Sequence, residues 1–350
     1  MILTACALFI CSFMSLFAFR KFAILINLVD QPNARKHHNG SVPLVGGLAV
    51  FIVVFSYLFI FPNTISSAML YLSCASVLLF VGVLDDLYDI SFRFRLILQI
   101  VISGLMMVFG ELFLANVGAI FGGTNIDLSY FGYLMTVICV VGAINAFNMV
   151  DGIDGLLGAL ATITFSSLGI LFYFNGQSEL MAFCAAIVVT TIPYILMNLG
   201  IPLGQRFKVF MGDAGSTVIG FTVVWLLLEG SQSTERAFSP ITALWLAAVP
   251  IIDAISTILR RVKKGLSPFK PDREHLHHIL LRLGFSSRQA LAVICFISVI
   301  FAAVGVLGDI YNVPEYIMLY TFILITVLYY FFMLRIWRIS VRIRRFLNIK

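Results

Sequence analysis

The chain carries little charge for its length. Only 11% of its 350 residues are Asp, Glu, Lys or Arg, whereas 61% are hydrophobic, and the mean hydropathy is +1.03. A soluble globular protein has about 25% charged and about 45–50% apolar residues. Although the length would allow two soluble domains, this composition excludes them because too few residues could face water.

Cysteine is also scarce. All six cysteines fall within apolar runs, and none stands at the spacing of zinc ligands. This pattern favours simple packing of the cysteines over a disulfide framework. The net charge of +6 does not indicate nucleic acid as a partner, because the basic residues lie beside apolar runs and suit lipid headgroups or phosphorylated substrates.

Long apolar runs, by contrast, are abundant. About 20 residues of helix cross a hydrocarbon core of ~30 Å. The sequence therefore predicts an all-α, polytopic integral membrane helix bundle of about eleven spans that forms one domain over residues 1–350. The predicted spans are 3–19, 43–62, 67–84, 96–115, 132–149, 156–174, 179–198, 216–230, 240–258, 289–307 and 316–334.

The basic residues predict the orientation of these spans. With the N-terminus periplasmic and the C-terminus cytosolic, 22 of the 23 lysines and arginines face the cytosol, and only Arg236 does not. The cytosolic parts include a histidine-containing loop at 259–288 and a basic tail at 335–350. The first apolar run lacks a basic start and a cleavage site, so we expect a span there and no signal peptide.

Three acidic motifs lie at the predicted cytosolic ends of spans. The first is the pair Asp85–Asp86. Adjacent carboxylates repel one another, and the arrangement persists most easily around a divalent cation or a shared proton. Ionisable groups at the membrane edge are candidates for function, although for a single acid such as Asp89 neutralisation of nearby Lys and Arg is an equally good explanation.

The second motif places a polar residue at every third position. It comprises Asn145, Asn148, Asp151 and Asp154. This spacing keeps neighbouring polar groups close together on a helix. Their oxygen atoms suit Mg²⁺ or the hydroxyls of ribose and sugars. Helix capping alone would need one such residue, and here there are four.

The third motif runs from Lys208 through Phe210 to Gly212-Asp213-Ala214-Gly215-Ser216-Thr217. We expect a tight turn at the glycines and a span that begins with Ser216–Thr217 as its N-cap. Such a helix start is suited to a phosphate or its metal ion. Lys208 would add a positive charge, and Phe210 would stack on a base.

Histidines mark the fourth motif, in the predicted loop 259–288. Arg273 precedes His275, His277 and His278. Zinc is disfavoured, because no cysteine accompanies the histidines and their spacing is poor for a tetrahedral ion. Hydrogen bonds from these side chains to a diphosphate are the better interpretation.

These motifs, in this order, resemble the polyprenyl-phosphate N-acetylhexosamine-1-phosphate transferase family. The resemblance also includes Asp30-Gln31-Pro32-Asn33-x-Arg35-Lys36 and Val42-Pro43-Leu44-Val45-Gly46-Gly47, and it extends over nearly the whole chain. Within the family, Leu276 interrupts the histidine run, which favours an N-acetylhexosamine without a peptide. The nearest likeness is to members that transfer GlcNAc-1-phosphate to undecaprenyl phosphate.

The resemblance implies a reaction and its participants. GlcNAc-1-phosphate would pass from UDP-GlcNAc to undecaprenyl phosphate with release of UMP, on the cytosolic face of a bacterial inner membrane. This step would initiate O-antigen or enterobacterial common antigen. Mg²⁺ is the expected cofactor, with Mn²⁺ as a substitute, and membrane lipids are expected partners. Assembly as a homodimer is left open.

The same resemblance assigns roles to residues. The expected catalytic residues are Asp85, Asp86, Asp151, Asp154 and Asp213. Asp213 is the first choice as metal ligand, with Asp85 and Asp86 binding metal or facing the lipid phosphate. The expected ligands of the nucleotide sugar and its diphosphate are Asn145, Asn148, Lys208, Phe210, Arg273, His275, His277 and His278.

Three alternatives stay open. The same chemistry with another UDP-N-acetylhexosamine is the nearest. A membrane prenyltransferase would explain Asp85-Asp86-x-x-Asp89 but neither Asp213 nor the histidines. A secondary transporter would place its ionisable residues near the bilayer midplane, whereas here they lie at its edge.

Overall fold

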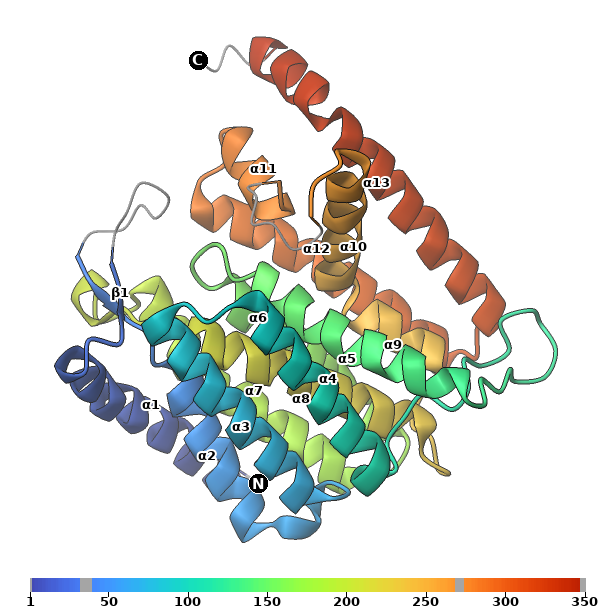
Figure 1. Ribbon diagram of the computed structural model, residues 1–350, viewed down its shortest axis with the longest axis horizontal. Coiled ribbons are helices and arrows are strands. Elements are labelled where there is room, and N and C mark those ends of the chain that lie inside the picture. Colours follow the sequence, from blue (N-terminus) through green and yellow to red (C-terminus); the bar gives the residue numbers. More distant parts are fainter. Residues whose placement is uncertain (1, 32–39, 268–273, 347–350) are drawn as a thin grey trace.

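The computed structural model describes residues 2–31, 40–267 and 274–346, with side chains described up to Ile336. Helices dominate the fold (Figure 1). They are α1 (Ile2–Leu25), α2 (Gly46–Ile60), α3 (Ala68–Tyr88), α4 (Phe92–Gly110), α5 (Phe131–Met149), α6 (Leu156–Phe174), α7 (Ser178–Leu199), α8 (Gly212–Gln232), α9 (Pro240–Leu246), α10 (Ala248–Lys263), α11 (Leu276–Arg282), α12 (Ser287–Ile310) and α13 (Glu315–Phe346). Two short strands, β1 (Val29–Asp30) and β2 (Val42–Pro43), pair antiparallel.

The helices match the membrane prediction in kind. Within the described ranges, nine helices are long and apolar enough to cross a membrane, and the bent pair α9–α10 would make ten. The helix α2 is shorter, with 15 residues. These findings confirm a polytopic membrane bundle. The count of eleven spans and the direction in which the chain crosses stay predictions.

The prediction of one continuous span at 240–258 is wrong. Helices α9 and α10 meet at an angle of 84°, and Ala247 between them is not helical. Pro250 has no N–H to donate to the carbonyl of Leu246, so the helical hydrogen-bond ladder fails at this point. The Thr164 hydroxyl donates to that carbonyl instead, at 3.0 Å.

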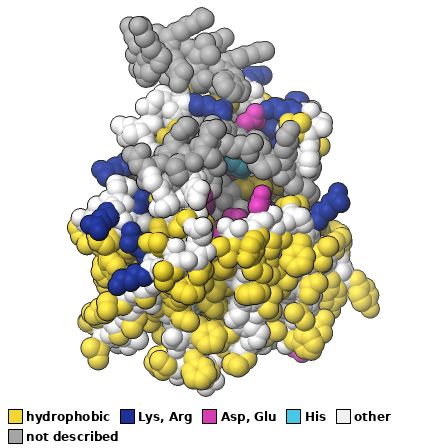
Figure 2. Space-filling view, turned by 60° about the vertical axis from the view of Figure 1, so that its left-hand side comes forward, with side chains coloured by type: hydrophobic (Ala, Val, Ile, Leu, Met, Phe, Trp, Pro, Cys, Tyr) yellow, Lys and Arg dark blue, Asp and Glu magenta, His cyan; other side chains and the backbone are white. Residues whose placement is uncertain are grey.

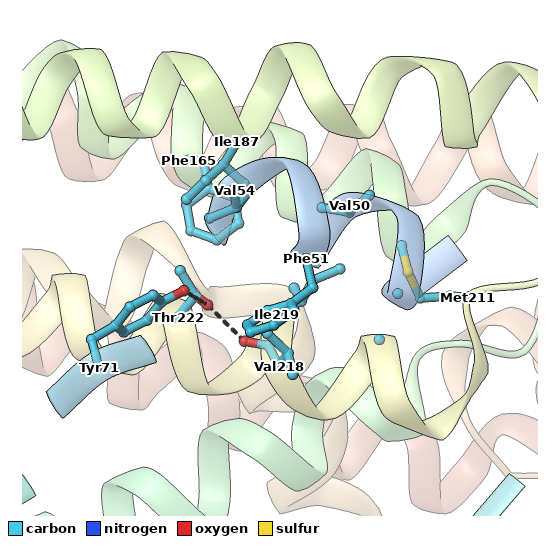
Figure 3. Close-up of a pocket in the computed structure, with 12 residues that line it drawn as sticks. Val50, Phe51, Val54, Tyr71, Phe165, Ile187, Met211, Val218, Ile219 and Thr222 are labelled. Atoms are coloured by element: carbon cyan, nitrogen blue, oxygen red, sulfur yellow. Dashed lines mark hydrogen bonds between the residues drawn. The ribbon is translucent and has the colours of Figure 1, made fainter. Parts of the chain in front are cut away.

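Helix α8 forms the centre of the bundle, and nearly all of its residues are buried. Small residues bring its first turn close to two neighbours. A Cβ atom on Gly82 of α3 would lie 2.3 Å from the Cα of Ala214, and one on Gly47 of α2 would lie 2.2 Å from the Cα of Gly215. Any larger residue would push these helices away from the start of α8. Further along α8, a small apolar cavity contains the hydrogen bond between Tyr71 and Thr222 (Figure 3).

Polar side chains gather at one end of the bundle. We call this the polar end; it comprises the last turns of α1, α3, α5, α7 and α10, the first turns of α4, α6, α8 and α12, the segment between α7 and α8, α11, and the part of α13 that packs on α11. In Figure 2, Lys and Arg side chains lie mostly above a broad hydrophobic surface, with acidic and histidine side chains visible between them. Of the basic residues whose side chains are described, Arg236 alone lies at the opposite end.

Candidate active site

The site is built around the first turn of α8. We expected this helix to start with Ser216–Thr217 as its N-cap, and that expectation is wrong. The helix begins at Gly212, and Met211 before it provides no side-chain cap. The cap comes from α3, where the Asp86 carboxylate accepts hydrogen bonds from the backbone N–H of Asp213 at 2.9 Å and of Ala214 at 3.3 Å. A carboxylate at this position satisfies exposed N–H groups and complements the helix dipole.

Gly212 is required for this arrangement. Its φ is +76°, a conformation that residues with a side chain rarely adopt, and a Cβ atom here would lie 2.5 Å from an oxygen of Asp86. The glycine before Asp213 therefore allows the carboxylate from α3 to reach the helix start.

The side chain of Asp213 is held from two directions and stays 42% exposed. One oxygen accepts from the Asn148 amide of α5 at 2.7 Å, and the other lies 3.5 Å from the Arg95 guanidinium of α4. Asn148 also donates to the Ser216 hydroxyl at 2.9 Å. The predicted metal ligand is thus an oriented carboxylate that a ligand can still reach.

Arg95 joins Asp213 to Asp85. Its guanidinium lies 2.6 Å from Asp85, whose side chain is almost fully buried and also accepts from the backbone N–H of Ile90 at 2.8 Å. Arg95 is not among the site residues predicted from the sequence. A signal was present, because a cation near a helix N-terminus opposes the helix dipole and therefore needs anionic partners.

Lys208 and Phe210 lie together in the extended segment before α8. The Lys208 ammonium is 2.7 Å from the Asp154 carboxylate and 5.1 Å from the centre of the Phe210 ring. The segment is fixed by backbone hydrogen bonds between Phe210 and the β2 strand end, and by the amide of Asn198, which donates to the carbonyl of Val209 at 2.7 Å. Asn198 also accepts from the backbone N–H of Gly155, and we had not predicted it as a site residue.

The histidine motif lies against the second acidic motif. His277 is 2% exposed, and its Nε2 has no hydrogen-bond partner within the described structure. A Cβ atom on Gly152 would lie 2.0 Å from that nitrogen, so the absence of a side chain at Gly152 makes the contact possible. Burial and the neighbouring His278 and His275 lower the pKa of His277 from 6.5 to about 3. The imidazole is therefore neutral near pH 7.

The other histidines flank this ring. The centres of His275 and His277 are 5.9 Å apart with nearly parallel planes, and those of His277 and His278 are 4.1 Å apart. The structure thus brings the three predicted histidines together, with His277 against the turn at Gly152. Arg273, predicted as their companion, lies outside the described residues.

Asn145 lies deeper in the bundle than this cluster, whereas Asp151 directly precedes Gly152. The Asn145 amide donates to the Gln99 side chain and to the Val141 carbonyl, both at 2.8 Å, about one turn deeper than Asn148. Gln99 was not predicted, and it is buried. Asp151 lies exposed in the turn that follows α5.

The donor atoms suit a hard cation. Asp85 and Asp213 already share the positive charge of Arg95, and their oxygens are the ligands that Mg²⁺ prefers. Across the described ranges, however, three or more His, Cys, Asp or Glu side chains nowhere form a group that could hold a metal ion by themselves. Mg²⁺ commonly binds one or two carboxylates together with substrate phosphates, so two carboxylates beside a phosphate fit it.

Known proteins match the part of the chain that contains these residues. Residues 68–231 match glycosyl transferase family 4, a stretch from α3 nearly to the end of α8 that contains Asp85, Asp154 and Asp213 but not the histidines. The undecaprenyl-phosphate alpha-N-acetylglucosaminyl 1-phosphate transferase of Escherichia coli strain K12 is 47% identical over 340 residues, which cover 97% of this chain and 92% of the relative. The proteins of the same name from Yersinia pestis and Haemophilus influenzae are 48% and 44% identical, over 97% and 96% of this chain and 93% and 95% of their own lengths.

Proposed function

The chain belongs to glycosyl transferase family 4, together with the undecaprenyl-phosphate alpha-N-acetylglucosaminyl 1-phosphate transferases that it matches along almost its whole length, and we propose that it shares their reaction. It transfers GlcNAc-1-phosphate from UDP-GlcNAc to undecaprenyl phosphate. The products are undecaprenyl-diphospho-GlcNAc and UMP. The observation that carries this proposal is the Asp213 carboxylate, exposed at the start of α8 and oriented by Asn148 and Arg95.

The reaction joins two anions, so the protein must mainly position them and neutralise their charge. An oxygen of the lipid phosphate attacks the β-phosphorus of UDP-GlcNAc, and the bond from that phosphorus to the UMP oxygen breaks. A phosphate with a second pKa near 6 is largely ionised at neutral pH, so a strong general base is unnecessary. Arg95, which now lies between Asp85 and Asp213, is positioned to receive phosphate charge.

Mg²⁺ is the cofactor that we propose, with Asp213 and Asp85 as its protein ligands. When bound, it would neutralise phosphate oxygens as negative charge develops on them. Asp86 has a different task in this scheme, because both its oxygens accept backbone N–H groups of α8. It keeps the helix start, and with it the side chain of Asp213, in place.

Lys208, Phe210 and the histidines form the side that receives the nucleotide. The Lys208 ammonium, now paired with Asp154, lies beside the Phe210 ring, which offers an aromatic face to a base. Neutral His277 presents Nε2 toward the Gly152 turn. We propose that this side binds the uridine and diphosphate of the donor, and that the polar end faces the cytosol of a bacterial inner membrane. The product would begin a cell-surface glycan such as O-antigen or enterobacterial common antigen.

Release of UMP tests the proposal. Protein purified in detergent is given UDP-GlcNAc and undecaprenyl phosphate, with and without Mg²⁺, and UMP is measured. We expect release only when all three are present. A parallel panel of UDP-GalNAc, UDP-glucose and UDP-MurNAc-pentapeptide identifies the donor. If no UDP-sugar gives UMP, the proposed reaction is wrong.

A further inference from the structure

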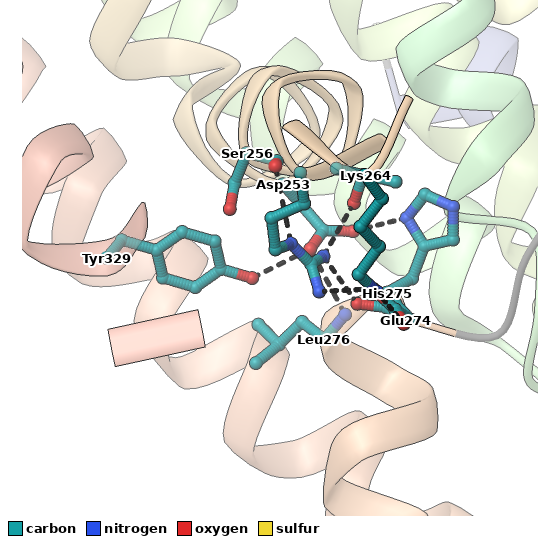
Figure 4. Close-up of polar contacts among 9 residues, drawn as sticks. Asp253, Ser256, Lys264, Glu274, His275, Leu276 and Tyr329 are labelled. Carbon is teal, nitrogen blue, oxygen red and sulfur yellow. Dashed lines mark hydrogen bonds and ion pairs between the residues drawn. The ribbon is translucent and has the colours of Figure 1, made fainter. Parts of the chain in front are cut away.

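A buried carboxylate outside the acidic motifs connects the histidines to the last helix of the chain. Asp253 of α10 is 3% exposed, and three donors surround it. The Nδ1 of His275 lies 2.8 Å from one oxygen; the other oxygen accepts from the backbone N–H of Leu276 at 3.1 Å and from the Tyr329 hydroxyl at 2.7 Å. Figure 4 shows Tyr329 and His275 approaching Asp253 from opposite sides.

This arrangement sets the state of His275. A carboxylate can only accept hydrogen bonds, so the Nδ1 atom must carry a proton and the ring is held in one orientation. The same carboxylate binds the first peptide N–H of α11, the helix that contains His277 and His278. The Asp253 carboxylate therefore binds both the ring of His275 and the backbone N–H of Leu276.

Helix α13 holds this assembly from outside. Besides Tyr329, its residues Met333 and Ile336 pack against Ile279 of α11 in a small apolar cluster. A second set of contacts holds Glu274, the residue before His275. Arg260 of α10 binds the Glu274 side chain at 3.1 Å and the Glu274 carbonyl at 2.7 Å. Helix α10 thus fixes the chain on both sides of His275, and α13 fixes the Asp253 carboxylate from the opposite direction.

We propose that Tyr329 is a positioning residue of the transferase: through Asp253 it holds His275 in the orientation that receives the diphosphate of the UDP-sugar. The inference rests on the function proposed above and extends it to a helix that carries none of the acidic or histidine motifs. Without the Tyr329 hydroxyl, the Asp253 oxygen that it binds loses one of its two donors in this network and keeps only the backbone N–H of Leu276. A buried carboxylate that lacks a donor shifts toward water or another donor, and His275 shifts with it.

The test removes one oxygen atom. Tyr329→Phe keeps the ring and its packing. Tyr330→Phe is the matched control, because the Tyr330 ring packs edge to face against Phe331 and its hydroxyl takes no part in this network. For Tyr329→Phe we expect the KM for UDP-GlcNAc to rise about 10-fold. The KM for undecaprenyl phosphate should stay within error of the wild type, and the melting temperature should fall by only about 2–4 °C from the lost hydrogen bond. Tyr330→Phe should match the wild type in every measurement.

A double-substitution cycle separates positioning from packing. If Tyr329 acts through His275, then adding Tyr329→Phe to His275→Ala changes the KM for UDP-GlcNAc by less than 2-fold. Additive effects would overturn the inference, as would a Tyr329→Phe protein with wild-type KM. So would a lower kcat with both KM values unchanged, because that result marks a loss of folded enzyme. If the wild type itself releases no UMP, the proposed function fails and the inference fails with it.

Discussion

Single carboxylates at the polar end differ in what holds them. Asp86 accepts two backbone N–H groups, Asp85 and Asp213 share Arg95, and Asp154 pairs with Lys208. Each acid has a donor or a cation within hydrogen-bond distance or close to it. Four acids can therefore converge beside a membrane without an uncompensated charge, which would cost several kcal/mol if buried.

Asp213 is the residue whose loss should affect chemistry most. Asp213→Asn keeps the shape and the helix start but removes the negative charge. We expect kcat to fall by about 10²–10³-fold, a loss comparable to removing one electrostatic contact of a transition state. The rate of UMP release by purified protein measures this.

Asp89→Asn is the matched control for that change. Asp89 is exposed at the same end and has a φ of +53°, which asparagine tolerates as well. We expect its turnover to stay near that of the wild type. Turnover of Asp213→Asn at the same level would contradict the role of Asp213.

At the scale of elements, the docking of α11 on the turn between α5 and α6 brings the histidines to the acids. Contact between them depends on Gly152, because its Cα hydrogens face the Nε2 of His277. A short helix of seven residues could not hold this position by itself. Its buried Ile279 and Leu280 and the Asp253 network supply the remaining contacts.

Gly152→Ala tests this docking. The new methyl group would stand 2.0 Å from Nε2 of His277, so α11 must move or the turn must open. We expect kcat/KM for UDP-GlcNAc to fall at least about 10-fold, as happens when a binding group is misplaced by about 1 Å. Gly142→Ala in α5 is the control, since a Cβ atom there meets nothing within 4 Å, and it should leave kcat/KM unchanged. Equal values for the two variants would show that the contact is unimportant.

The low pKa of His277 predicts a pH dependence of stability. The pKa is about 3 in the folded protein and about 6.5 in an unfolded chain. Below pH 6.5 the unfolded chain therefore takes up a proton that the folded chain does not, and stability falls as the pH falls. The wild type should lose about 1.4 kcal/mol from this group between pH 7.5 and pH 5.5.

His277→Gln isolates this contribution. The variant has no titrating group at this position, so its free energy of unfolding should fall less over the same interval, by about 1.4 kcal/mol. Denaturation with sodium dodecyl sulfate in mixed micelles at the two pH values gives the two slopes. Parallel slopes would show that His277 is not buried in its neutral form.

At the scale of the whole molecule, charge is sorted between the two ends of the bundle. Basic residues with described side chains lie at the polar end except for Arg236, which faces Glu315 at the other end. Basic residues are retained on the cytosolic side of bacterial inner membranes. The polar end should therefore face the cytosol, where UDP-sugars are present.

Labelling with a membrane-impermeant maleimide tests this orientation. Ser287→Cys places a thiol at the polar end and Asn63→Cys places one at the opposite end; both positions are exposed. In intact cells with a permeable outer membrane, we expect Asn63→Cys to react and Ser287→Cys to react only after lysis. The unaltered chain controls for its own cysteines. The reverse pattern would place the site outside the cytosol.

The sequence by itself determined the class of fold and the family, and it supplied most of the residues that we propose for the site. The length of the apolar runs requires helices in a membrane. An acid or histidine at the end of such a run is a candidate for a functional site, because an ionisable group at the membrane edge is costly unless it is paired or binds a ligand. Gly212 and Asp213 form one short motif, and the histidines form another. Each could be recognised because its residues lie within a few positions of one another in the sequence. The span at 240–258 misled, because its hydropathy is continuous although Pro250 interrupts its hydrogen bonds.

Only the tertiary structure decided which partner each of these residues has. Asp86 caps a helix that begins 126 positions later, Arg95 lies between two acids from different helices, and Tyr329 binds a carboxylate 76 residues away. Such pairs depend on how closely two helices approach, which glycines such as Gly82 set by the absence of a side chain. A local sequence pattern does not give the distance between two helices, because the sequence of a helix end is the same whichever helix packs beside it.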